Sequence, residues 1–216
     1  MKKFVIFLFA VLTTILFWGS CSSNKTNDYD DTDISQSMKN GISEHSSAIA
    51  SYMILLENFC AESDIIRFAL RDLDNDGIPE LLIIQEDENA LNAVLTVYSY
   101  GDNVYKIGDY SNTENSFKSI LRFSNNSKFP GLFDFCWGGG IDHYTYLTIK
   151  EGKLVSEYIW YEDRTVEPSQ KVEISSNKQL INECIDVYTN WDSPDNLLEI
   201  YFINDDNISQ IPMLYP

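Results

Sequence analysis

Two patterns of apolar residues alternate along the chain, short runs bounded by turn residues and apolar positions spaced by three or four. The short runs are typical of β-strands, because their flanks are rich in Gly, Asp and Asn. Two pairs of runs are separated by Gly-bearing turns and predict β-hairpins. The predicted strands are residues 65–70, 81–84, 93–100, 104–108, 120–123, 131–135, 144–149, 154–161 and 198–203.

Helical spacing occurs in three segments. Ile49, Met53 and Leu56 predict a helix that begins near Ser43 or Ser46 and ends at Cys60. Residues 176–189 predict a second helix, and a short third helix follows a cap at Asp205 or Asp206. Because the strands do not alternate with helices, we expect an α+β fold, an antiparallel β-sheet meander with a few flanking helices in one domain.

The most informative segment is residues 72–80, where three aspartates alternate before Gly77. Calcium takes six to eight oxygen ligands, and such a loop supplies several from one tight turn. Glycine permits the sharp turn that aims the carboxylates at one point. The predicted Ca²⁺ ligands are the side chains of Asp72, Asp74, Asp76 and Glu80 and the main-chain carbonyl of Ile78. The alternative is an acidic surface turn that binds nothing.

The loop differs from an EF-hand, because Ile83 stands at the twelfth position and strands flank the loop. It resembles the calcium loops of FG-GAP and VCBS-type repeats, which carry a fourth carboxylate at the ninth position, here Glu80. Residues 68–82 also resemble a motif of uncharacterised surface lipoproteins of gut Firmicutes and Bacteroidota. This resemblance implies calcium binding at a cell surface. A single loop does not imply a propeller, which needs several blades.

The amino terminus has the pattern of a secretory signal peptide. Lys2 and Lys3 precede an apolar run, which is short for a membrane-spanning helix. Small residues then lead to Cys21, an arrangement that resembles a bacterial lipobox and implies lipid attachment at Cys21. Ordinary secretion and an uncleaved anchor are the alternatives. The expected location is the bacterial cell envelope, membrane-anchored and extracytoplasmic.

These signals predict three parts, a signal peptide over residues 1–20, an acidic tether over residues 21–40 and a globular domain over residues 41–216. The tether is polar and too poor in apolar residues to offset the entropy of ordering it. Removing residues 1–20 takes away two lysines and no acid, which changes the net charge from −18 to −20. A chain this acidic is repelled by nucleic acid, so nucleic acid is excluded as a partner.

The remaining cysteines are Cys60, Cys136 and Cys184, an odd number without a Cys-x-x-Cys pair. This pattern argues against a zinc or redox site. Cys60 and Cys184 fall on the apolar sides of predicted helices, where a buried cysteine acts as a small hydrophobic residue. A disulfide between Cys60 and Cys184 is an alternative that the spacing does not decide.

Catalytic motifs are scarce. Cys136, Asp142 and His143 surround a Gly-rich segment and could be assembled into a nucleophile site. We interpret the segment instead as a turn that joins two strands, and assign no catalytic residue. Trp137 and Trp191 are expected in polar or Gly-rich loops and are the candidates for exposed ligand-binding aromatics.

Two function classes remain. The first is a lipid-anchored, calcium-stabilised, non-catalytic domain that binds a glycan, a protein or an envelope partner. The second is an extracytoplasmic hydrolase that uses carboxylates, which would face each other about 5 to 10 Å apart in a pocket. The first is our hypothesis, with calcium as the cofactor.

Overall fold

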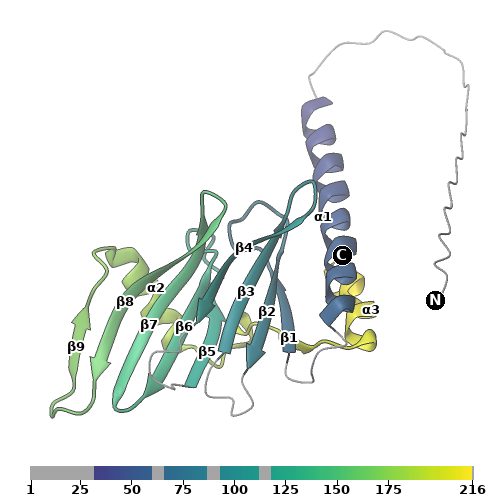
Figure 1. The fold of residues 1–216 in the computed structure, drawn as a ribbon. Coiled ribbons are helices and arrows are strands. Elements are labelled where there is room, and N and C mark those ends of the chain that lie inside the picture. The colour runs from purple at the N-terminus through teal and green to yellow at the C-terminus, as the bar shows by residue number, and fades with distance from the viewer. Residues whose placement is uncertain (1–31, 60–65, 87–92, 112–117, 216) are drawn as a thin grey trace, which may run out of the picture.

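Two five-stranded antiparallel sheets and three helices make up the computed structural model (Figure 1). It describes residues 32–59, 66–86, 93–111 and 118–215. The predicted signal peptide, Cys21 and Cys60 lie outside these residues. Within them, no helix is long and apolar enough to span a membrane.

The helices are α1 (Thr32–Phe59), α2 (Lys178–Thr189) and α3 (Asp205–Leu214), with a 3-10 turn at Pro194–Asn196. The strands are β1 (Ile66–Arg71), β2 (Glu80–Glu86), β3 (Ala93–Tyr100), β4 (Val104–Ser111), β5 (Lys118–Phe123), β6 (Leu132–Gly138), β7 (Ile141–Lys150), β8 (Lys153–Asp163), β9 (Gln170–Glu173) and β10 (Tyr201–Phe202). The predicted α+β fold with an antiparallel meander is confirmed, as two meanders rather than one.

The strand order in the first sheet is β10-β1-β2-β3-β4, and in the second sheet β5-β6-β7-β8-β9. Within each sheet, neighbours in sequence are therefore neighbours in space, except β10, which returns to the edge of β1. Antiparallel strands that follow each other in sequence can be joined by turns. One of these turns is the acidic loop between β1 and β2, and another is the Gly139–Gly140 turn between β6 and β7.

Alternating residues of the strands pack in opposite directions, as the period of a β-strand requires. Phe68 and Leu70 of β1 pack with Tyr52 of α1 and Ile208 of α3 in one apolar cluster. Ala69, between them, belongs to a second cluster. Figure 1 shows α1 and α3 side by side next to the first sheet.

The second cluster joins the two sheets, because it contains Leu82 and Leu95 from the first sheet and Leu132 and Leu147 from the second. One polar bridge crosses the same interface. The hydroxyl of Tyr110 donates to the fully buried carboxylate of Asp134 at 2.8 Å. The two meanders are thus fixed to each other as one domain.

A third cluster packs α2 on the other face of the second sheet. It contains Leu180 and Cys184 from the helix, with Phe133, Phe135 and Tyr144 from the strands. Cys184 is fully buried and is a free thiol, so it forms no disulfide. Burial of Cys184 as a small hydrophobic residue is confirmed.

Candidate functional site

The acidic loop between β1 and β2 brings three carboxylates together. Asp72, Asp74 and Glu80 each offer an oxygen, and these oxygens lie within 4.8 Å of one another. This acidic triad could hold a metal ion. Asp76 lies outside the triad and accepts the main-chain N–H of Ile78 at 2.7 Å. All the candidate metal-ligand atoms are oxygen atoms, which suit a hard cation.

Backbone geometry shapes the loop around Asp72. Its Oδ1 accepts the N–H of Asn75 at 2.6 Å, and its Oδ2 accepts the N–H of Gly77 at 2.9 Å. Asn75 and Gly77 have positive φ values of 63° and 87°, a region that Asn and Gly tolerate best. The sequence Asp-Asn-Asp-Gly therefore folds the loop so that several N–H groups point at one carboxylate.

Glu80 is the buried member of the triad, with no exposed surface. Its carboxylate accepts the N–H of Leu73 at 2.8 Å and the hydroxyl of Ser99 at 3.2 Å. Burial raises the pKa of Glu80 to about 8, and the negative charge of Asp74 adds to the rise, while both hydrogen bonds oppose it. Burial also raises the pKa of Asp74, helped by the charge of Asp76. Close, desolvated carboxylates favour a compensating cation.

Two neighbours of the loop could not be identified from the sequence. The side-chain amide of Asn75 donates to the carbonyl of Ser127 at 2.6 Å, which connects the loop to the second sheet. The hydroxyl of Tyr52, from α1, is buried and has no hydrogen-bond partner among the described residues. Burial raises the pKa of Tyr52, and the charges of Glu80 and Asp76 add to the rise.

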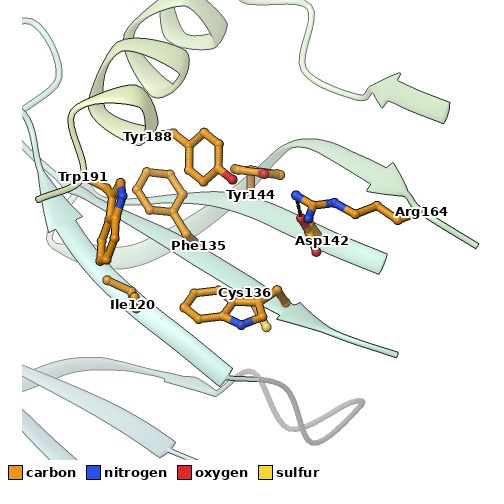
Figure 2. A pocket seen from close by; sticks show the side chains of 9 residues that line it. Ile120, Phe135, Cys136, Asp142, Tyr144, Arg164, Tyr188 and Trp191 are labelled. Carbon is orange, nitrogen blue, oxygen red and sulfur yellow. Dashed lines mark ion pairs between the residues drawn. The ribbon is translucent and has the colours of Figure 1, made fainter. Parts of the chain in front are cut away.

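A cavity of about 330 Å³ opens on the second sheet, at its α2 face (Figure 2). The candidates Trp137 and Trp191 both line it, although they are 54 residues apart in the sequence. They are 38% and 47% exposed. The lining residues are Ile120, Phe135, Cys136, Trp137, Asp142, Tyr144, Arg164, Tyr188 and Trp191.

Strand register brings the cavity residues of the sheet together. Trp137 pairs with Asp142, and Phe135 pairs with Tyr144, across the hairpin of β6 and β7. Paired residues point to the same face of a sheet, so these four side chains form one surface. The positive φ values of Gly139 and Gly140 close this hairpin. The Gly-rich segment is therefore a turn, as interpreted, and His143 is not among the residues that line the cavity.

The helix side of the cavity is aromatic. Tyr188, in the last turn of α2, lies edge-on to Phe135 at 5.3 Å and to Tyr144 at 5.1 Å between ring centroids. Trp191 follows the helix and is held by Arg122 of β5, whose Nε donates to the Trp191 carbonyl. The guanidinium of Arg122 also lies 5.5 Å from the Trp191 ring centroid.

One ion pair forms the polar end of the cavity. Arg164 contacts the carboxylate of Asp142, as Figure 2 shows, and its main-chain N–H donates to Gly140 at 2.7 Å. Burial raises the pKa of Asp142, and the charge of Arg164 opposes that rise. Sequence reasoning missed Arg164 and Tyr188. Tyr188 belongs to the predicted helix over residues 176–189, but nothing in the sequence paired that helix with this hairpin.

In comparisons with protein-family models, with curated proteins and with solved structures, nothing matched the chain.

Proposed function

We propose that this protein is a lipid-anchored, extracytoplasmic domain of the bacterial cell envelope that is stabilised by calcium. It binds a glycan, a protein or another envelope partner, and it does not transform that partner. The strongest support is the cavity, which is lined by Trp137, Trp191 and the Asp142–Arg164 ion pair.

Calcium is the proposed ion because the candidate ligands are all oxygen atoms. Asp72, Asp74 and Glu80 supply convergent carboxylates, and Asp76 and the carbonyl of Ile78 are the proposed further ligands. A calcium ion would neutralise carboxylates that otherwise repel each other beside the buried Glu80. Its role is structural, because it would fix the turn between β1 and β2.

The cavity supports ligand binding because it combines exposed aromatic surface with a fixed polar group. Small-molecule sites are concave, mostly apolar and contain a few placed polar groups. Exposed aromatic side chains are also common in protein-binding hot spots. The lining of this cavity has both properties.

The cavity favours binding over hydrolysis. A carboxylate-dependent hydrolase needs two facing carboxylates, one as acid and one as base or nucleophile. Asp142 is the one carboxylate among the residues that line the cavity, and it is paired with Arg164.

The test is binding of the purified, fluorescently labelled protein to isolated bacterial envelopes, with calcium or with a chelator. We expect calcium-dependent binding that Trp191→Ala abolishes. The matched control is Phe202→Ala, because Phe202 is also an exposed aromatic and lies on the other sheet. Unchanged binding of Trp191→Ala would remove the cavity from the proposal. Soluble sugars or peptides that accumulate with time would indicate the hydrolase.

A further inference from the structure

We infer that the cavity binds a neutral sugar of one or two pyranose rings, whose hydroxyl groups contact Asp142 and Arg164 and whose apolar face lies against Trp137 or Trp191. This inference rests on the proposed function, since it takes the cavity to be the binding site. It adds the chemical class of the ligand and the role of each group.

The size of the cavity limits the ligand to a small one. Its volume of about 330 Å³ lies near the lower end of the range of ligand sites, roughly 300–1,000 Å³. A folded protein segment or a long chain would not fit inside it. The terminal unit of a glycan would fit, with the rest of the chain extending into solvent past the exposed rings of Trp137 and Trp191.

The charges of the lining favour a neutral ligand. Asp142 and Arg164 are its charged residues and pair with each other, and Glu162, outside the lining, lies 3.9 Å from Arg164, so no positive charge is left over for an anion. The whole chain carries a net charge of −18, which repels anions over a long range. A cation would have to compete with Arg164 for the carboxylate. A ligand without charge meets neither penalty.

The ion pair matches the chemistry of adjacent hydroxyl groups. Asp142 offers acceptor oxygens, and the half-exposed Arg164 offers several N–H donors beside them. Each hydroxyl of a sugar both donates and accepts, so two neighbouring hydroxyls can bind a carboxylate and a guanidinium at once. Asp142 is nearly buried, and the main chain of Arg164 is fixed to Gly140, so little ordering would accompany binding.

The aromatic walls match the other surface of a pyranose. The C–H groups of the ring form an apolar face, which can cover an exposed indole and remove it from water. Trp191 suits this role because Arg122 already fixes its main chain. The polar edge and the apolar face of the ligand would thus meet the two kinds of surface in the lining.

The experiment is a titration of the purified protein, followed by tryptophan fluorescence and ligand-observed NMR. The probes are D-glucose, D-galactose, D-mannose, N-acetyl-D-glucosamine, cellobiose and lactose, with D-glucuronate as the anionic probe and choline as the cationic one. We expect at least one neutral sugar to bind, and to bind better than either charged probe. Trp191→Ala and Asp142→Asn should each weaken that binding about tenfold or more.

Two matched variants control for general effects. Phe202→Ala removes an exposed aromatic, and Asp109→Asn removes an exposed, ion-paired carboxylate, both on the first sheet. Both should bind the sugar as the wild type does, and thermal melts should show all four variants folded. Binding of a neutral sugar that Trp191→Ala and Asp142→Asn leave unchanged would place it elsewhere and overturn the inference.

Binding of glucuronate or choline alone would also overturn the inference, while the proposed binding cavity would stand if Trp191→Ala abolished that binding. The sugar inference would also fail, and the binding cavity would stand, if no probe binds but the envelopes still capture the wild type and not Trp191→Ala. If no probe binds and the envelopes do not capture the wild type either, the proposed function itself is wrong.

Discussion

The carboxylate of Glu80 accepts the main-chain N–H of Leu73 at 2.8 Å, so the first residue of β2 is fastened to the start of the loop that precedes it. Leu73 is itself fully buried between the sheets. The acidic loop is therefore anchored to the core by a carboxyl group that is buried away from water. Occupation of the loop by a cation should consequently affect the stability of the whole domain.

Calcium should raise the melting temperature of the purified protein. Extracellular sites of this kind have dissociation constants of about 10⁻⁴ to 10⁻³ M. About a hundredfold excess of calcium would stabilise the fold by roughly 2.7 kcal/mol. For a domain of this size, that gain corresponds to about 5–11 °C. Thermal melts with calcium and with a chelator measure it, and equal melting temperatures would identify the loop as an acidic turn.

Asp74→Asn should remove most of the gain from calcium. The variant loses one charge from the triad, and Asp74 is exposed, so the fold without calcium should lose little. Asp109→Asn is the matched control, because it removes an exposed carboxylate from β4. A full calcium response in Asp74→Asn would show that the triad does not hold the ion.

Without calcium, the protein should become less stable as the pH rises from 5 to 8. Burial raises the pKa of Glu80 to about 8, above its ordinary value of 4.5. Between these values the folded protein binds more protons than the unfolded chain, so the stability is present at low pH and is lost as the pH rises through about 8. Excess calcium should reduce or reverse this trend, because it favours the ionised carboxylates.

Thermal melts in chelator across this pH range test the direction. Glu80→Gln keeps the shape of the side chain and cannot ionise, so its melting temperature should depend less on pH. An equal pH dependence in wild type and Glu80→Gln would assign the effect to other groups, of which Asp74 and Asp142 also have raised pKa values.

Most strands could be predicted because they are short apolar runs, and these runs are buried in the structure. Residues 93–100 were predicted with the bounds that β3 has. The strand β9 was missed because Gln170–Glu173 is a mostly exposed edge strand without an apolar face. The predicted start of the first helix at Ser43 or Ser46 was wrong, since α1 begins at Thr32. Its first turns lack the apolar spacing on which the prediction depended.

The candidate site was predictable only where the chemistry is local. Asp72, Asp74 and Glu80 converge within one loop, so their spacing contains the information. The cavity depends on contacts between distant segments. Trp137 pairs with Asp142 across a hairpin, and Trp191 follows α2 in the sequence and lines the same cavity. Exposed tryptophans could be proposed from the sequence, but their shared cavity required the packing of α2 on the second sheet.

Cys21→Ala should release the protein from the membrane or stop its processing. The prediction depends on the lipobox-like segment before Cys21, which lies outside the described residues. Stable anchoring needs more than one acyl chain, and all of these chains would be attached at Cys21. A variant without Cys21 therefore loses its membrane anchor. Fractionation of cells that express each form measures the effect. Cys136→Ala is the control thiol variant, because it removes a buried cysteine of the second sheet. Wild-type protein found only in the medium would contradict the anchor.

Gly131→Ala should destabilise the domain by about 1–3 kcal/mol, because it overpacks a closed site. A Cβ at Gly131 would lie 1.9 Å from the carbonyl oxygen of Leu147, which is main chain and cannot rotate away. The N–H of Gly131 also donates to the hydroxyl of Tyr146 at 3.1 Å, so any shift of the backbone would strain a buried hydrogen bond. The melting temperature should fall by roughly 2–12 °C.

In the control Gly101→Ala, the nearest atom would be 3.7 Å away, in Tyr105, so its melting temperature should stay close to that of the wild type. Equal melting temperatures of Gly131→Ala and Gly101→Ala would show that β6 and β7 do not approach as closely as described.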